Sequence, residues 1–140
     1  MLTLVMFLSI WICDTLAFVV GSKFGEKKIL PSISPKKTWV GTIAGFLSVL
    51  IFNFLLFKFD VFAQLNYNFT FLDVLNFGII FGIIGQFGDF FESLIKRQVG
   101  VKDSGFLLQG HGGVLDRMDS LILASPCFYL YIKFIIGLNV

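Results

Sequence analysis

Residues 38–57 read TWVGTIAGFLSVLIFNFLLF, twenty consecutive residues without a charged side chain. A helix of about 20 apolar residues, rising 1.5 Å per residue, crosses the roughly 30 Å of hydrocarbon in a bilayer. Three further stretches are of similar length and character, at residues 2–20, 72–91 and 120–138. We therefore expect about four transmembrane helices.

The composition of the whole chain agrees with this expectation. Of its 140 residues, 56% are hydrophobic and 14% charged, and the mean hydropathy is +0.88. A globular domain of this size cannot bury so much apolar surface, which excludes the soluble, disordered and fibrous classes. Cys13 and Cys127 lie inside apolar runs, so we expect neither a disulfide nor a zinc site. The prediction is an all-α integral membrane protein, with residues 1–140 forming a single polytopic domain.

The cations are distributed unevenly along this chain. The net charge of +2 is too small to indicate nucleic-acid binding, but nine of the eleven Lys and Arg residues lie in two connections, between spans one and two and between spans three and four. The positive-inside rule predicts that both connections are cytoplasmic, with Lys58 and the C-terminus on the far side. The nine cations are Lys23, Lys27, Lys28, Lys36, Lys37, Lys96, Arg97, Lys102 and Arg117.

Two features near the first connection indicate an anion-binding site. Asp14 lies about 9 Å inside the first span, which we expect to end near Gly21 and Gly25, and a charge at that depth faces protein or a water-filled cavity rather than lipid. Ser34-Pro35-Lys36-Lys37-Thr38 directly precedes the second span, where Thr38 can cap the helix and the helix N-terminus adds amide donors beside two ammonium groups. This pattern predicts a phosphate cradle. A buried hydrogen bond of Asp14 and lipid-headgroup contacts of the lysines are the alternatives.

The third span ends in a stripe of polar residues at helical spacing, formed by Asp89, Glu92, Ser93 and Lys96. For Glu92 and Lys96, a surface ion pair is the simplest alternative to a functional role. Asp89 lies deeper, among glycines at positions 82, 85 and 88 that leave room for another helix or a ligand close to the backbone.

The densest polar cluster runs from Lys102 to Ser120. Its glycines allow a sharp reversal, after which Asp116 and Asp119 face the same way at the start of the fourth span. Two neighbouring carboxylates repel each other, and a hard divalent cation relieves that repulsion, so we expect Mg²⁺ here. Helix capping is the alternative for the two aspartates, and a structural hydrogen bond in the turn is the alternative for His111.

These residues, in this order, resemble the phosphatidate cytidylyltransferases (CDP-diacylglycerol synthases). The signature of that family reads Ser-x-x-Lys-Arg, four residues, Lys-Asp, and then His-Gly-Gly-x-x-Asp-Arg-x-Asp, and the chain matches it from Ser93 to Asp119. Asp14-Thr-x-Ala and Ser34-Pro-Lys-Lys-Thr-Trp are similar to the family as well. The departures are Phe18, Ser22, Val40 and Gln109. Because members carry additional N-terminal spans, the chain is expected to correspond to their C-terminal catalytic part.

The resemblance implies transfer of CMP from CTP to phosphatidate, giving CDP-diacylglycerol and pyrophosphate in phospholipid biosynthesis. The implied cofactor is Mg²⁺, and two-metal catalysis leaves room for a second cation. The implied partners are CTP, phosphatidate, membrane lipids and a second copy in a homodimer, with no nucleic acid. The implied location is the cell (inner or plasma) membrane, with the active site on the cytoplasmic face.

The resemblance also assigns roles to individual residues. The expected catalytic residues are Asp89, Asp116, Asp119 and Lys37. The expected metal ligands are Asp89, Glu92, Asp116 and Asp119. The expected contacts to substrate and phosphate are Asp14, Ser34, Lys36, Lys37, Thr38, Ser93, Lys96, Arg97, Lys102, Asp103, His111 and Arg117.

Two other hypotheses belong to different classes of protein. In the first, the chain is a noncatalytic half that needs the N-terminal spans. In the second, it is an ion-transporter fragment in which Asp14, Asp89 and Lys133 form a path for ions. The transporter is disfavoured because the acidic residues collect near one face, whereas a path needs polar groups through the full depth of the membrane.

Overall fold

The computed structural model describes residues 1–63, 69–101 and 118–137. Within these ranges, four helical segments are long and apolar enough to cross a membrane, namely Leu2–Phe24, Trp39–Lys58, Phe71–Gln98 and Asp119–Ile136. The prediction of an all-α integral membrane protein with four spans is therefore confirmed.

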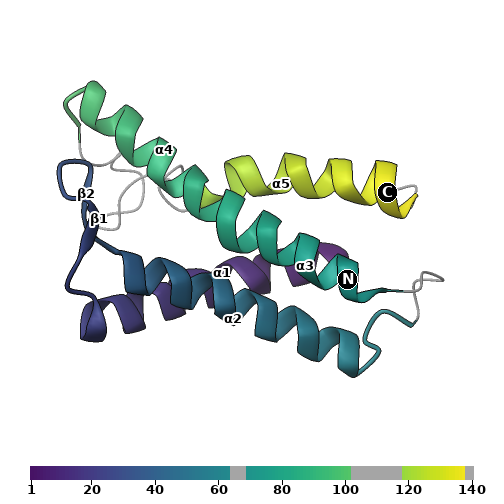
Figure 1. Cartoon of the computed structure of the whole chain (residues 1–140). Helices are drawn as coiled ribbons and strands as arrows, with labels where there is room; N and C mark the ends of the chain where they lie inside the picture. Colours follow the sequence, from purple (N-terminus) through teal and green to yellow (C-terminus); the bar gives the residue numbers. More distant parts are fainter. Residues whose placement is uncertain (64–68, 102–117, 138–140) are drawn as a thin grey trace.

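The four spans form a bundle that carries a short β-hairpin at one end (Figure 1). Helix α1 (Leu2–Phe24) leads through strands β1 (Lys28–Leu30) and β2 (Ser34–Thr38) into α2 (Trp39–Lys58). The third span is a continuous helical run of α3 (Phe71–Phe77), the π-helical η2 (Gly78–Ile84) and α4 (Gly85–Gln98). The fourth span joins α5 (Asp119–Tyr131) to the π-helical η4 (Ile132–Ile136).

Glycines allow α1 and α2 to lie side by side at short distance. A Cβ atom at Gly41 would lie 2.5 Å from the carbonyl oxygen of Ala17, and one at Gly45 would lie 3.0 Å from that of Cys13. Gly41 and Gly45 are four residues apart and so occupy one face of α2, the small-residue pattern by which membrane helices approach closely.

The glycines of the third span have the role predicted for them. A Cβ at Gly88 would lie 2.6 Å from the carbonyl oxygen of Asp119, and one at Gly82 would lie 2.9 Å from the ring of Phe46. These contacts pack the third span against α5 on one side and α2 on the other. They also place the start of α5 beside the part of α4 that carries Asp89.

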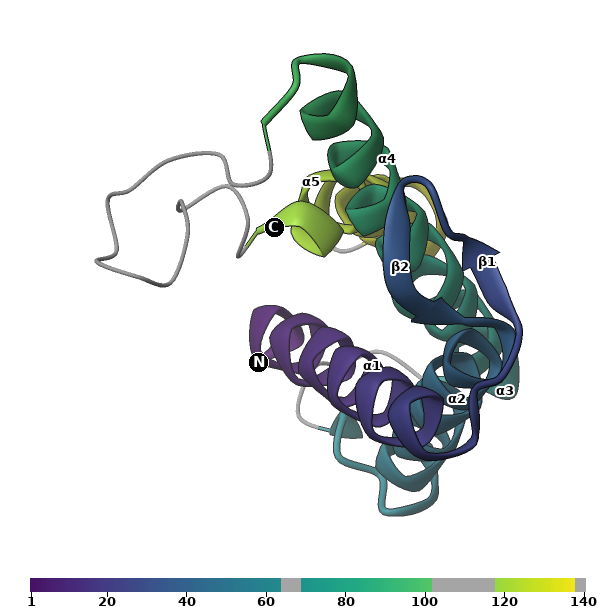
Figure 2. The same ribbon diagram turned by 90° about the vertical axis from the view of Figure 1, so that its left-hand side faces the viewer.

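The first helix is longer than predicted, and the hairpin was not predicted. Helix α1 continues to Phe24 and is capped by Gly25, one of the two glycines near which we expected it to end, whereas Gly21 lies within the helix and faces Gly41. Strands β1 and β2 pair antiparallel, with Lys28 opposite Thr38 and Leu30 opposite Ser34 (Figure 2). The hairpin brings Ser34–Thr38 back over the helix ends and so positions the polar residues of this segment.

Candidate functional site

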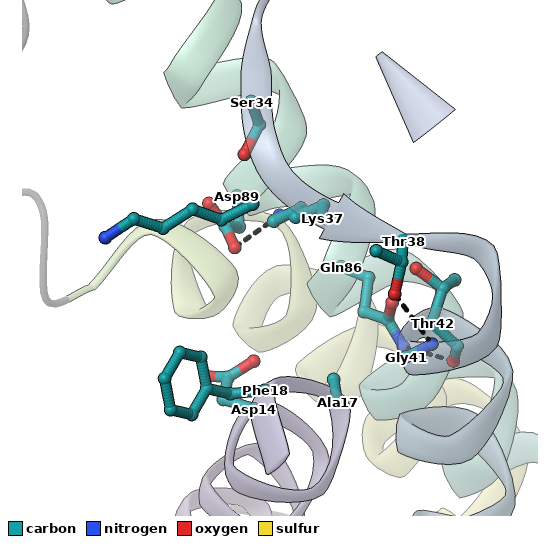
Figure 3. A pocket seen from close by; sticks show the side chains of 11 residues that line it. Asp14, Ala17, Phe18, Ser34, Lys37, Thr38, Gly41, Thr42, Gln86 and Asp89 are labelled. Atoms are coloured by element: carbon teal, nitrogen blue, oxygen red, sulfur yellow. Dashed lines mark hydrogen bonds and ion pairs between the residues drawn. The ribbon is translucent and has the colours of Figure 1, made fainter. Parts of the chain in front are cut away.

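A polar cavity of about 290 Å³ lies at the hairpin end of the bundle. Helix α1, strand β2, helix α2 and helix α4 all contribute to its wall (Figure 3). It is lined by Asp14, Ala17, Phe18, Ser34, Lys36, Lys37, Thr38, Gly41, Thr42, Gln86 and Asp89. Segments that are far apart in the sequence therefore meet around one cavity.

Lys37 and Asp89 form an ion pair across this cavity. The ammonium group of Lys37 also lies 3.9 Å from the centre of the Phe90 ring, where a cation–π interaction adds to its attachment. The two side chains of the ion pair are 22% and 27% exposed, so the pair is largely shielded but still open to the cavity. A cation and an anion are thus held close together at a site that a charged ligand can reach.

Asp14 faces the same cavity from α1. Figure 3 shows its carboxylate across the open space from Asp89 and Lys37, and it interacts electrostatically with both. The expectation that Asp14 faces a cavity rather than lipid is confirmed. Because α1 continues to Phe24, Asp14 lies about 15 Å from the end of its helix, deeper than the sequence indicated.

Thr38 caps α2, as its position before the helix predicted. Its Oγ1 accepts a hydrogen bond of 3.2 Å from the backbone N–H of Gly41, and the residue is buried. This bond satisfies one of the free amide groups at the helix N-terminus. Thr38 therefore helps to set the direction in which α2 leaves the hairpin and the cavity wall.

Gln86 is a cavity residue that the sequence analysis did not single out. Its Nε2 lies 3.1 Å from the carbonyl oxygen of Thr42, 2.8 Å from that of Gly82 and 3.3 Å from Sγ of Cys13. These contacts connect the third span with α1 and α2 at the base of the cavity. The sequence did contain a signal for this role, since a polar side chain inside an apolar span normally faces the protein interior.

Asp119 and Glu92 lie next to Asp89 on the side of α5. Asp119 is the first residue of α5, accepts a 2.7 Å hydrogen bond from the N–H of Ser120, and interacts electrostatically with Asp89 and Glu92. Glu92 pairs with Lys96 at 3.0 Å, and it is only 5% exposed, so this is a buried ion pair rather than the surface pair considered above. In the described ranges, no three His, Cys, Asp or Glu side chains are grouped so that they could hold a metal ion.

A second polar cavity, of about 250 Å³, adjoins the first and is lined by several Lys and Arg side chains. It shares Ser34 and Lys36 with the first cavity, and the end of α4 forms its other wall. The Nε of Arg97 donates a 3.3 Å hydrogen bond to the carbonyl oxygen of Ile33, which holds the hairpin against α4. The lining residues are Ile33, Ser34, Pro35, Lys36, Ser93, Lys96 and Arg97.

Most of the predicted site residues in the described ranges thus line one of two neighbouring cavities. The first contains Asp14, Ser34, Lys36, Lys37, Thr38 and Asp89, and the second adds Ser93, Lys96 and Arg97. Glu92 and Asp119 line neither cavity, and the remaining predicted residues lie outside the described ranges, namely Lys102, Asp103, His111, Asp116 and Arg117.

Comparison with known proteins identifies the class to which this membrane fold and polar site belong. The sequence model of the cytidylyltransferase family matches residues 1–135, and the chain belongs to that family. Among its relatives, the phosphatidate cytidylyltransferase of Thermotoga maritima is 44% identical over 130 residues, covering 92% of this chain and 48% of the relative.

Two other relatives extend the comparison. The phosphatidate cytidylyltransferase of Haemophilus influenzae is 38% identical over 136 residues, which are 96% of this chain and 46% of the relative. Phosphatidate cytidylyltransferase 4, chloroplastic, of Arabidopsis thaliana is 46% identical over 131 residues, which are 94% of this chain and 32% of the relative. The chain therefore spans half or less of the length of these relatives.

Proposed function

We propose that the chain contains the catalytic site of a CTP:phosphatidate cytidylyltransferase, which transfers CMP from CTP to phosphatidate. A phosphate oxygen of phosphatidate forms a bond to the α-phosphorus of CTP, the bond from that phosphorus to the bridging oxygen breaks, and pyrophosphate leaves with the electron pair. The observation that carries this proposal is the pair of adjoining cavities, one around Lys37 and Asp89 and one around Lys96 and Arg97, at the end of membrane-spanning helices. The names and similarity of the relatives support the same reaction.

The cations around the cavities address the main electrostatic obstacle of this reaction. Nucleophile and electrophile are both anionic, and they approach each other only where positive charge offsets their repulsion. Lys37 lines the first cavity, Lys96 and Arg97 line the second, and Lys36 lines both, so all four cations are placed to contact substrate phosphate. Arg97 is suited to a phosphate because its planar group can donate two parallel hydrogen bonds.

Asp89 and Asp119 fit a divalent cation by the chemistry of their donor atoms. Their carboxylates interact with each other and supply the oxygen ligands that Mg²⁺ prefers, and Asp116 would add a third carboxylate. Glu92, held by Lys96, would support this site from the interior. Bound Mg²⁺ supplies Lewis-acid stabilisation of phosphate charge, and a second cation would act in the same way. Lys37 neutralises Asp89 in the structure, so we infer that it shifts toward substrate phosphate when a cation binds.

The setting of the site in the cell is also part of this proposal. The excess of Lys and Arg in the two connections at the cavity end supports a cytoplasmic position for the site, in the cell (inner or plasma) membrane. Phosphatidate would reach the site from the surrounding lipid and CTP from the aqueous side. We further propose that the working form is a homodimer, as the family resemblance implies.

The decisive experiment measures CDP-diacylglycerol and pyrophosphate formed by this chain in liposomes with CTP, phosphatidate and Mg²⁺. We expect product with Mg²⁺, none with EDTA, and a loss of at least about 100-fold in Asp89→Asn, because that carboxylate is central to the charge balance of the site. The rate of product formation by Asp116→Asn should fall below about a tenth of the rate of the unmodified chain. Lys58→Gln, at the other end of α2, serves as the control and should keep full activity.

A chain that makes no product alone is tested again with the N-terminal half of the Thermotoga maritima relative supplied in trans. Product in that arm would support the proposed reaction and assign the N-terminal half a necessary role. Mg²⁺-dependent CTP binding without product in either arm would identify a noncatalytic half, and the proposed function would then be rejected.

A further inference from the structure

An apolar groove of about 520 Å³ lies between the start of α2 and the third span, next to both polar cavities. The first turns of α2 form one wall, η2 and α4 form the other, and the hairpin covers the end. Its most prominent side chains are Leu30, Ile33, Phe46, Ile83, Phe87 and Phe90. None of the described residues that line this groove is charged.

The polar side chains of this lining are Thr42 and Gln86, and both also line the first polar cavity. Ile33 in turn is shared with the second, cationic cavity. The groove therefore lies directly beside two cavities that are suited to phosphate. A ligand that occupies both the groove and a cavity must have an anionic group directly attached to a hydrocarbon portion.

Part of the lining of this groove is exposed on the outside of the bundle. Ile43, Phe87 and Phe91 line it and are 53%, 63% and 57% exposed, on helices that span the membrane. Gly82 and Phe46 also line the groove, and the absence of a side chain at Gly82 allows Phe46 to pack directly against the third span. The apolar lining, the exposed side chains and the polar residues shared with the first cavity are the features expected of a site that receives a lipid chain from the membrane.

We propose that this groove binds one acyl chain of the phosphatidate whose phosphate occupies the first polar cavity, which contains Lys36 and Lys37. The inference rests on the proposed function, because that function makes phosphatidate the lipid that the cavities receive. The volume lies within the range of specific ligand pockets, and an apolar lining with a few polar groups at one end is typical of sites for amphiphilic ligands. Binding here would hold the glycerol backbone beside Thr42 and Gln86, and so direct the phosphate toward Lys36 and Lys37.

The first test is photolabelling of the whole chain in liposomes with a phosphatidate that carries a diazirine in one acyl chain. We expect the label on peptides from the two walls, residues 39–46 and 83–94. An excess of unlabelled phosphatidate should remove it, whereas phosphatidylcholine and phosphatidylglycerol should not. This readout needs no turnover, so it tests the groove even if the proposed reaction fails.

The second test narrows the groove by Ile83→Trp and compares it with Ile79→Trp, one helical turn away. Ile79 is similarly exposed, at 45% against 38% for Ile83, but it does not line the groove. We expect Ile83→Trp to abolish the competable label and to raise KM for dioleoyl phosphatidate about tenfold, with KM for dihexanoyl phosphatidate and for CTP unchanged. Ile79→Trp should change none of these quantities.

Three results would overturn the inference. Label spread evenly over the exposed helix faces, or removed equally well by phosphatidylglycerol, would indicate general lipid contact. Equal effects of Ile83→Trp on long-chain and short-chain phosphatidate would indicate a structural disturbance. Crosslinking of an Ile83→p-benzoylphenylalanine variant to peptides rather than to lipid would show that a protein segment covers the groove. Absence of CDP-diacylglycerol in both arms of the activity experiment, with specific labelling retained, would reject the proposed function alone.

Discussion

Lys37 is held in place from two directions, by the carboxylate of Asp89 and by the face of the Phe90 ring. Its ammonium group therefore already lies beside the cavity, and the shift toward substrate phosphate proposed above takes place within that cavity. Preorganised charge of this kind is worth far more than the same charge on a mobile surface side chain. Among the described residues, Lys37 is therefore the cation whose loss should affect turnover most directly.

The first prediction concerns Lys37→Gln. We expect CDP-diacylglycerol formation to fall about 100-fold to 1,000-fold, the range observed when a preorganised stabilising group is removed from an active site. The rate is measured in liposomes, with size-exclusion chromatography to check that the protein is intact. Lys58→Gln is the matched control, and a loss of similar size in that variant would contradict the assignment of Lys37 to the site.

A second polar cluster lies near the other end of the third span and has a structural role. Asp73 is 2% exposed and accepts hydrogen bonds from the N–H of Thr70 at 2.6 Å and from its hydroxyl at 2.7 Å. The hydroxyl of Tyr131 donates to the other carboxylate oxygen, and Asn76 donates to that hydroxyl at 3.2 Å. The cluster joins the start of α3 to the end of α5, about 24 Å along the third span from Asp89.

The second prediction separates this cluster from catalysis. Tyr131→Phe should lower the free energy of unfolding by about 1 to 2 kcal/mol, because a hydrogen bond to a buried carboxylate is lost. The turnover number should be unchanged because the site is remote. Thermal unfolding in detergent measures the effect, with Tyr129→Phe as the control, since that ring is 46% exposed. Equal shifts in the two variants would argue against the proposed importance of the Asp73 contact.

At the scale of elements, the approach of α1 and α2 determines the shape of the first cavity. Gly41 lies in the cavity wall and also touches α1, where an added Cβ would meet the backbone oxygen of Ala17 at 2.5 Å. Backbone cannot move aside as a side chain can. A larger residue here must therefore separate the two helices that carry Asp14 and Thr42.

The third prediction follows from this contact. Gly41→Ala should destabilise the protein by about 1 to 3 kcal/mol through overpacking, although helix propensity alone would stabilise it by about 1 kcal/mol. The sign of the change in melting temperature thus decides between the two effects. Val40→Ala places the same residue one position earlier, at a site that is 40% exposed, and should change stability by less than about 0.5 kcal/mol. A Gly41→Ala protein that is more stable than the unmodified chain would contradict the close approach of α1 and α2.

The elements differ in how far their local sequence predicts them. Thr38 was correctly predicted to cap α2, because capping depends only on a hydroxyl placed directly before a helix. The hairpin was missed because its second strand, Ser34–Thr38, contains Pro35 and two lysines instead of the alternating apolar residues of a half-buried strand. Its pairing instead follows from the short connection between two closely packed helices and from the contact of Arg97 with Ile33.

At the scale of the whole molecule, the described cavities and the groove share one end of the bundle. The polar cavities lie around β2, and the apolar groove lies between α2 and the third span, with Thr42 and Gln86 in the walls of both kinds of site. A reaction between a water-soluble nucleotide and a membrane lipid requires such an arrangement, because each substrate must approach from its own phase. The orientation of this end in the membrane is therefore a property of the whole fold.

The fourth prediction tests that orientation. Single cysteines are introduced at Ser32, in the exposed turn of the hairpin, and at Phe59, which is 72% exposed just after α2, in a background of Cys13→Ala and Cys127→Ala. A membrane-impermeant maleimide should label Phe59→Cys in intact cells and Ser32→Cys only in inverted vesicles, because the hairpin lies in a cation-rich connection. The reverse pattern would place the site on the far side and contradict the positive-inside assignment.

The sequence by itself determined the four spans and identified the polar residues at one end of them. Both results depend on local properties, since the cost of placing charge in hydrocarbon and the need to satisfy backbone hydrogen bonds act on each segment separately. Only the tertiary structure decided that Asp14 shares a cavity with Lys37 and Asp89, that Gln86 connects three spans, and that an apolar groove adjoins the site. These relations depend on which helix faces meet, and that choice rests on contacts such as Gly41 with Ala17 and Gly88 with Asp119, between residues far apart in the chain.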